Sequence, residues 1–281
     1  MMAPSKLKLM HQYTAERIGR EHGLMILTAI STILVSILLA GCSSSQNLSA
    51  VYVLSMYYQI PGQTAVATQQ GTSSTHTNIA NMVATAVANS TPIEVRAGYF
   101  NLCVRRGNDQ WECCRDPSAL QIRLSDADPL GLIGIAGMFR GNVILPWFLI
   151  LQVVLHLVTL SALAAFSSWH EDSPALSLFS GPSLARTAQF ASGAAAFFAL
   201  LSALWQHAAA SAVQAIIGAT SFGYVVSKTG AAAMAIGWIS YFLLLFVFFV
   251  ILMMRRYWQN LNLPACSSDL GMFRSKQMGD N

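Results

Sequence analysis

Cysteine is the residue type in this chain best suited to covalent chemistry, and three of the five cysteines gather in one short stretch. Cys103, Cys113 and Cys114 lie in a polar segment that also carries Tyr99 and Phe100. Because adjacent cysteines are poorly placed to pair with each other, one of Cys113 and Cys114 should form a disulfide with Cys103. We predict the Cys103–Cys113 bridge, since an odd-length hairpin loop places these two residues opposite each other, and keep Cys114 as the alternative.

A second bridge is expected between Cys42 and Cys114, because both fall on the same side of the membrane in the topology derived below. Four cysteines allow three connectivities. Cys266 lies in a polar tail and should stay reduced. Zinc is the competing interpretation, but the usual Cys-x-x-Cys spacing is absent. We therefore expect disulfides and no metal site.

The other chemistry-bearing residues do not form a catalytic pattern. His156 and His207 fall in apolar runs that contain no Asp or Glu, and we predict polar helix contacts or an interfacial position for them. No phosphate-binding glycine loop, HExxH motif or nucleophile elbow is present. We expect no enzymatic activity and no cofactor.

Carboxylates outside the apolar runs could bind Ca²⁺ through hard oxygen ligands. Six arginines of the same segment can balance these five acids, so we predict a solvated, salt-bridged surface instead. The acids are Asp109, Glu112, Asp116, Asp126 and Asp128, and the arginines are Arg96, Arg105, Arg106, Arg115, Arg123 and Arg140.

The elements that must hold these residues are membrane spans. The chain has 281 residues, of which 54% are hydrophobic and only 10% charged, with a mean hydropathy of +0.49. A soluble domain carries about a quarter charged residues, and a spanning helix needs about 20 apolar ones. Four runs qualify, at 23–43, 143–166, 188–211 and 230–254. The net charge of +4 forms no basic stripe, which argues against nucleic-acid binding.

Charge asymmetry sets the predicted topology. Residues 1–22 are basic, Ser43 to Ile93 holds no charged residue, and Arg255 with Arg256 follows the last span. The positive-inside rule then places both termini in the cytoplasm and the loop 44–142 outside. The predicted organisation is a tail at 1–22, a membrane domain at 23–256 and a tail at 257–281.

Two further sequence patterns bear on this topology. Asn47 and Asn89 each begin an N-glycosylation sequon in the outer loop. The stretch 39–43 (Leu-Ala-Gly-Cys-Ser) is similar to a bacterial lipoprotein cleavage box. We favour a first transmembrane helix there, because the apolar run is longer than a signal-peptide core of about 7–15 residues and three more spans follow.

The outer loop is predicted to fold as a small sheet on the membrane-proximal ends of the spans. Strand composition marks 51–58, 94–104 and 110–114, and helices are expected at 79–87 and 130–139. Gly107-Asn108 is a hairpin signal. Gly98 should allow close backbone approach or a bulge, while the aromatic side chains pack toward the helix ends. Between the third and fourth spans we expect close packing through alanines 191, 195, 199 and 203 against Ala233 and Gly237.

The whole pattern resembles the claudin-like superfamily of four-span proteins with a stapled outer sheet. The motif Gly98, Tyr99, Phe100, Leu102, Cys103 stands where claudins have Gly-Leu-Trp-Cys, but it lacks the Trp and is two residues longer. A closer resemblance is to the fungal family of Ca²⁺ regulator and membrane fusion proteins, the factor-induced family of mating. The segments that carry this resemblance are 41–45 (Gly-Cys-Ser-Ser-Ser), 51–54 (Val-Tyr-Val-Leu), 98–104 and 128–130 (Asp-Pro-Leu).

The resemblance implies an all-α, four-helix membrane bundle with a disulfide-stapled extracellular sheet. It also implies a plasma-membrane regulator of low-affinity Ca²⁺ influx and of cell fusion during mating. Expected partners are the lipid bilayer, Ca²⁺ channel subunits, and like molecules in cis or in trans. The fungal Sur/PalI group of cortical-patch and pH-sensing proteins is one alternative. A channel or transporter subunit, with Gln152 and His156 on a polar path, is the other.

Overall fold

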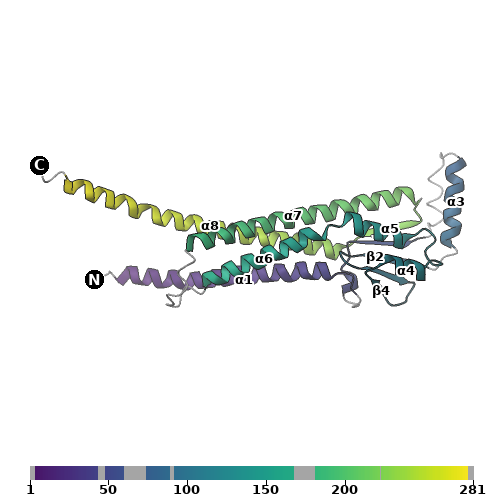
Figure 1. Cartoon of the computed structure of the whole chain (residues 1–281), viewed down its shortest axis with the longest axis horizontal. Coiled ribbons are helices and arrows are strands. Elements are labelled where there is room, and N and C mark those ends of the chain that lie inside the picture. Colours follow the sequence, from purple (N-terminus) through teal and green to yellow (C-terminus); the bar gives the residue numbers. More distant parts are fainter. Residues whose placement is uncertain are drawn as a thin grey trace. The chain divides into compact units, whose positions relative to one another are not determined.

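The computed structural model describes residues 4–43, 48–59, 74–88, 92–167, 181–221 and 223–277. The chain divides into two compact units. Unit 1 holds Met1–Ile30, Val154–Ala196 and Phe242–Asn281, and unit 2 holds Ser31–Val153 and Phe197–Tyr241. Several long helices contribute to both units, and the strands all belong to unit 2 (Figure 1).

Within the described residues, four helices are long and apolar enough to cross a membrane. They are α1 (Pro4–Ala40), α6 (Pro146–Ser167), α7 (Gly181–Thr220) and α8 (Ala231–Gln277). The apolar parts are His22–Ala40, Pro146–Ala165, Ser183–Thr220 and Ala231–Arg256. The first, second and fourth begin and end within a few residues of the predicted runs, whereas the third is longer than predicted at both ends. Pro146 opens α6, where its missing N–H costs no helical hydrogen bond.

Five strands form one antiparallel sheet with the order β4-β3-β2-β1-β5. Their bounds are β1 Leu54–Tyr58, β2 Ile93–Ala97, β3 Leu102–Arg106, β4 Glu112–Cys114 and β5 Val225–Thr229. In the register, Leu54 lies opposite both Ala97 and Thr229, and Cys103 lies opposite both Arg96 and Cys113. The hairpin between β3 and β4 turns at Gly107, whose φ of +52° suits glycine.

The strand predictions need correction at one strand and miss another. The single strand expected over 94–104 is a pair of strands, because the chain turns between Gly98 and Asn101. The amide of Gly98 donates to the carbonyl oxygen of Asn101 at 3.0 Å and closes that turn. The strand β5, which lies between the third and fourth spans, was not predicted, and it forms one edge of the sheet.

Shorter elements fill the rest of the segment between the first and second spans. The 3₁₀ turn η1 (Leu48–Ala50) follows the first span, and α3 (Ser74–Ala88) contains the predicted helix at 79–87. The helix α5 (Leu132–Met138) runs into the π-helical turn η3 (Phe139–Val143), again close to prediction. The helix α4 (Pro117–Arg123) was not predicted; Asp116 caps it by accepting from the backbone amide of Ser118 at 3.0 Å.

The core of unit 2 lies between one face of the sheet and the adjoining helices. Alternate strand residues point to this face, as the pleat requires, and they are fully buried. They pack with residues of α1, α5, α6, α7 and α8 in one cluster. The buried strand residues are Leu54, Met56, Tyr58, Ile93, Val95, Ala97, Leu102, Val104 and Val225.

Small residues let α7 and α8 approach each other in each unit. In unit 2, a Cβ on Gly237 would lie 3.9 Å from that of Ala203, and in unit 1 a Cβ on Gly193 would lie 2.9 Å from the ring of Phe248. All four predicted alanines of α7 are buried. The predicted close packing is thus confirmed at Ala203 with Gly237, while Gly193 is a contact that the sequence pattern missed.

Candidate functional site

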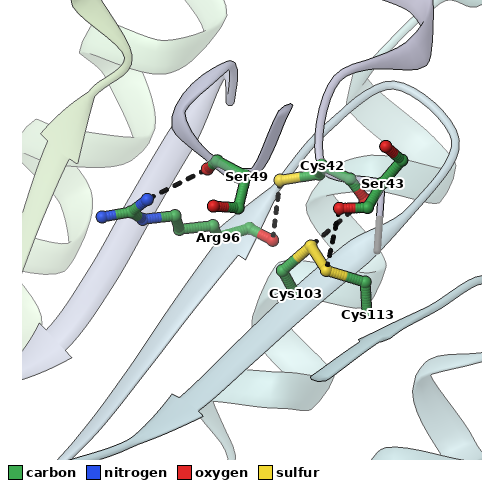
Figure 2. The surroundings of a disulfide bond; sticks show 6 residues. All are labelled: Cys42, Ser43, Ser49, Arg96, Cys103 and Cys113. Atoms are coloured by element: carbon green, nitrogen blue, oxygen red, sulfur yellow. Dashed lines mark hydrogen bonds between the residues drawn. A yellow bond between two sulfur atoms is a disulfide. The ribbon is translucent and has the colours of Figure 1, made fainter. Parts of the chain in front are cut away.

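The predicted bridge joins Cys103 of β3 to Cys113 of β4. Figure 2 shows it beside the segment that follows the first span. The Sγ atom of Cys103 lies 3.1 Å from the carbonyl oxygen of Cys42, and that of Cys113 lies 3.4 Å from the carbonyl oxygen of Ser43. We call Cys42, Gly98, Cys103 and Cys113 the cysteine corner. It brings the segment after α1 against strands β3 and β4 at one edge of the sheet.

The second predicted bridge, between Cys42 and Cys114, is wrong in this structure, where both residues are free. Successive strand residues point to opposite faces, so Cys114 packs against the core of unit 2 while Cys113 lies at the cysteine corner. The thiol of Cys42 points toward the carbonyl oxygen of Arg96, 3.7 Å away. Burial raises the pKa of Cys42 to about 12, partly offset by the charge of Arg96, so this thiol is a poor nucleophile.

Glycines make the cysteine corner possible. A Cβ on Gly98 would lie 2.7 Å from the Cβ of Cys42 and 2.8 Å from the carbonyl oxygen of Gly41. A Cβ on Gly41 would lie 2.5 Å from the carbonyl oxygen of Val51. Cys42 itself has a φ of +56°, in the left-handed region that non-glycine residues seldom adopt. The predicted close backbone approach at Gly98 is confirmed.

The aromatic residues of the motif take different positions. Tyr99 is buried, and its hydroxyl donates to Oε1 of Gln206 on α7 at 3.0 Å; burial raises the pKa of this phenol. Leu102 is fully buried in the core. Phe100 was expected to pack toward the helix ends, but it is 38% exposed. It sits in the turn between β2 and β3, where its carbonyl oxygen accepts from Arg140 at 3.4 Å.

A charged cluster occupies the sheet face that carries the disulfide. Arg96 donates to Glu94 and to the carbonyl oxygen of Ser49, both at 2.9 Å. Its guanidinium lies 4.0 Å from the ring centre of Trp111 and 4.7 Å from that of Tyr52, as expected for cation–π pairs. Arg105 adds a 2.8 Å pair with Glu94 and a 4.7 Å contact with Trp111. We call Tyr52, Glu94, Arg96, Arg105 and Trp111 the arginine network.

The charges of the arginine network set the ionisation of Glu94. Burial alone would raise the pKa of this carboxyl, but the hydrogen bond and charge of Arg96, with help from Ser55 and Arg105, hold the pKa below its usual value. Glu94 is therefore ionised at neutral pH and bound on several sides. Sequence reasoning counted these arginines only as matching charges. Glu94 and Arg96 are two residues apart on one strand, so their side chains lie on the same face, and Arg105 lies opposite Glu94 on the next strand. This alternation of charged residues is the sequence signal that could have predicted the cluster.

Asp128 has a structural role. Its carboxylate accepts from the hydroxyl of Tyr58 at 2.6 Å and from the backbone amides of Leu132 and Ile133 at 2.7 and 2.8 Å. Both oxygen atoms are thus occupied at the start of α5, where the helix dipole favours negative charge. Through Tyr58, Asp128 ties α5 to strand β1.

The other carboxylates weighed as Ca²⁺ ligands are dispersed. Glu112 pairs with Arg123 at 3.5 Å, and Asp116 caps α4. Among the residues that the structure describes, no three His, Cys, Asp or Glu side chains gather where they could hold a metal ion. The sequon residues Asn47 and Asn89 lie outside the described residues.

Polar side chains also meet inside the spans of unit 2. The hydroxyls of Ser31 on α1 and Ser240 on α8 lie 2.8 Å apart, and the amide of Gln152 on α6 donates to Ser240 at 3.2 Å. His156, farther along α6 and in unit 1, is fully buried, and neither ring nitrogen has a hydrogen-bond partner in the described part of the chain. His207, in contrast, is exposed on α7.

Four apolar helices and a small stapled sheet define the class: a mostly helical, multi-pass membrane protein. The model of the family described as Ca²⁺ regulator and membrane fusion protein Fig1 matches residues 79–256. The chain belongs to this family, and the description assigns it a function in Ca²⁺ regulation and membrane fusion. A search among curated proteins found no match.

Proposed function

We propose that this protein acts in the plasma membrane as a regulator of low-affinity Ca²⁺ influx and of cell fusion during fungal mating, and that it is not itself the conducting pore. The sheet would lie outside and both termini inside the cell. One observation carries the regulatory assignment: the carboxylates best placed near the sheet already serve the fold. Glu94 binds two arginines, and Asp128 binds a hydroxyl and two amides.

A Ca²⁺ pore is normally lined by rings of Asp or Glu. The four apolar spans contain neither residue. We infer that Ca²⁺ enters through a partner, such as a channel subunit, and that the sheet side of this protein contacts that partner or a like molecule. The stapled sheet above four spans also supports the proposed place in the claudin-like superfamily.

The test is complementation of a deletion strain, with Ca²⁺ uptake and mating fusion measured in the same cells. The wild-type chain should restore both activities. Cys103→Ser should restore neither Ca²⁺ uptake nor fusion, because it releases β4 from the sheet. The variant should still reach the cell surface, because its spans remain inserted in the membrane. Cys114→Ser is the matched control, since Cys114 is free. Full activity of Cys103→Ser at normal abundance would remove the sheet from the mechanism.

A channel or transporter subunit is the second candidate, favoured by the hydrogen-bonded group of Ser31, Gln152 and Ser240 across three spans. Conduction along a polar path requires these side chains to contact the ion. Gln152→Leu would then change ion selectivity in patch recordings. Under the regulatory proposal, the same variant changes only how much current the partner channel carries.

The proposed topology has its own test. Tags at the two ends should both resist external protease on intact cells and become cleavable after permeabilisation. Cleavage of either tag on intact cells would contradict cytoplasmic termini. Loss of an N-terminal tag during maturation would favour the lipoprotein interpretation of 39–43.

A further inference from the structure

A crevice lies in unit 2 where the sheet meets the starts of the spans. The π-helical turn η3, the first turns of α6 and one face of α7 form its walls, and Tyr99 lies on the sheet side. It has room for a group of about the size of one water molecule and is partly open to the surroundings. Its lining is Val53, Tyr99, Phe139, Val143, Ile144, Leu145, Phe148, Ser202, Trp205, Gln206 and Ala209.

Tryptophans place the crevice at the membrane boundary. Trp205 is 45% exposed and donates from its indole nitrogen to the carbonyl oxygen of Val143 at 2.8 Å. Trp147, next to the lining residues of α6, is 72% exposed. Exposed tryptophans of membrane proteins concentrate at the level of the lipid headgroups, and α6 begins here, at Pro146. The crevice therefore meets the lipid at the boundary on the sheet side.

Three polar side chains interrupt the apolar lining. Ser202 and Gln206 lie one turn apart on α7, each about 5–6% exposed, and Gln206 accepts from Tyr99. The amide nitrogen Nε2 of Gln206 is buried and has no hydrogen-bond partner in the described residues. Rotating the amide by 180° would pair the nitrogen with Tyr99 and leave the oxygen alone instead. Either way, one polar atom of Gln206 remains to be satisfied, which is costly in an apolar setting.

We propose that the crevice binds a membrane lipid whose polar group is a single hydroxyl, with a sterol as the leading source. A hydroxyl both donates and accepts, so it satisfies Gln206 in either amide orientation. None of the lining residues is charged, which argues against phospholipid headgroups. The space admits only a group about as large as a water molecule, far less than a pocket that encloses a whole ligand. The hydroxyl end therefore enters while the hydrocarbon remains in the bilayer.

Photo-crosslinking to the full-length protein in nanodiscs tests this proposal, with a photoactivatable cholesterol that keeps its free 3-hydroxyl. Labelling of the wild-type chain should be saturable and should map to η3, α6 or α7. Gln206→Leu and Ser202→Ala should each weaken it, Gln206→Leu by about tenfold, as expected for the loss of one buried hydrogen bond. Gln152→Leu is the matched control, because it removes another buried span amide and should leave labelling unchanged. Melting curves identify variants that fail to fold, and Tyr99→Phe then provides a milder change at the same polar group.

Competitors distinguish the sources of the hydroxyl. Unlabelled cholesterol should compete at least tenfold better than cholestane, which has the same rings and no oxygen. Stronger competition by diacylglycerol than by cholesterol would keep the hydroxyl-lipid site and replace the sterol. Equal competition by cholestane or by phosphatidylcholine, labelling that does not saturate, or full labelling of well-folded Gln206→Leu would each overturn the proposal.

Discussion

The two faces of the five-stranded sheet are built from alternate residues of the same strands, yet they are held in different ways. The face toward the helices carries Leu54, Met56 and Val95, which are fully buried. The opposite face carries the disulfide, the arginine network and Lys228, whose ammonium lies 5.1 Å from the ring centre of Tyr57. Burial of apolar area stabilises the first face, whereas a covalent bond, ion pairs and ring contacts stabilise the second.

We infer that the two faces have different roles: the helix-facing side stabilises the fold, and the opposite side contacts other molecules. Apolar burial contributes about 25 cal/mol per Å², so the helix-facing side should dominate stability. The ion pairs of the arginine network are only partly buried, with side chains 18–37% exposed. Such pairs contribute about 1 kcal/mol each, so the arginine network can change without unfolding the protein. A surface that binds a partner must tolerate changes of its side chains without unfolding of the protein. Four predictions test the comparison, beginning with the largest effect.

Gly230→Val should abolish folding of the sheet. A Cβ at this position would lie 1.6 Å from the carbonyl oxygen of Tyr52, which is rigid backbone, and the amide of Gly230 donates to the carbonyl oxygen of Val53 at 2.9 Å. The variant should be retained or degraded in cells and aggregate in detergent. Gly218→Ala is the control, because nothing lies within 4 Å of its Cβ. Normal surface expression of Gly230→Val would show that the β1–β5 edge is dispensable.

Leu54→Ala should destabilise the sheet by about 2–5 kcal/mol, the usual cost of a cavity in a packed core. Leu54 is fully buried, and it lies between Ala97 of β2 and Thr229 of β5 in the register. Thermal melts in detergent measure the change. Val226→Ala, on the opposite face of β5, should cost much less. Equal losses for the two variants would mean that the faces do not differ as described.

Joint replacement of Cys103 and Cys113 by serine should cost about 2–4 kcal/mol, within the range for removal of a disulfide. The spans should remain inserted, because their apolar contacts do not involve the bridge. Thiol labelling should find Cys103 protected in the wild-type chain and accessible only after reduction. A native Cys103 that reacts freely with alkylating reagents would refute the staple itself.

Glu94→Gln should have the smallest effect, at most about 1 kcal/mol, and it should depend on pH. The pKa of Glu94 is lower in the folded chain, so its ionised form stabilises the fold above the unfolded pKa of about 4.3. That contribution disappears as the pH falls through the folded value. The wild-type chain should therefore lose stability toward acid more steeply than Glu94→Gln. Parallel stability curves would exclude a stabilising role for the arginine network.

Much of the fold could be predicted from the sequence, for identifiable reasons. The four spans follow from uninterrupted apolar runs, and the Cys103–Cys113 bridge follows from a hairpin that Gly107 permits. Gly98 was expected to lie at a close approach, because a glycine in a strand context often does.

Other features depend on contacts that no local pattern encodes. The strand β5 is a short, mildly polar edge segment, and it becomes a strand because β1 offers its free edge. The turn at Gly98 to Asn101 splits one apparent strand, and it leaves Phe100 exposed. Cys114 does not meet Cys42, because the side chain of Cys114 points to the core face of β4 and that of Cys113 points to the opposite face. The crevice could not be foreseen, because Tyr99 and Gln206 meet only when sheet and α7 are both in place.

The pairing of β1 with β5 also dictates when the sheet can be finished. Leu54 and Thr229 are neighbours in the register, although most of the chain separates them. Ribosomes add about 5–20 residues per second, so roughly ten to thirty seconds pass between the synthesis of the two strands. During that interval the free edge of β1 exposes unpaired N–H and C=O groups, which form a template for pairing with another chain. The last span begins directly after β5, the strand that completes the sheet. Under the proposed topology, the sheet is therefore finished only after the segment between the last two spans has been translocated.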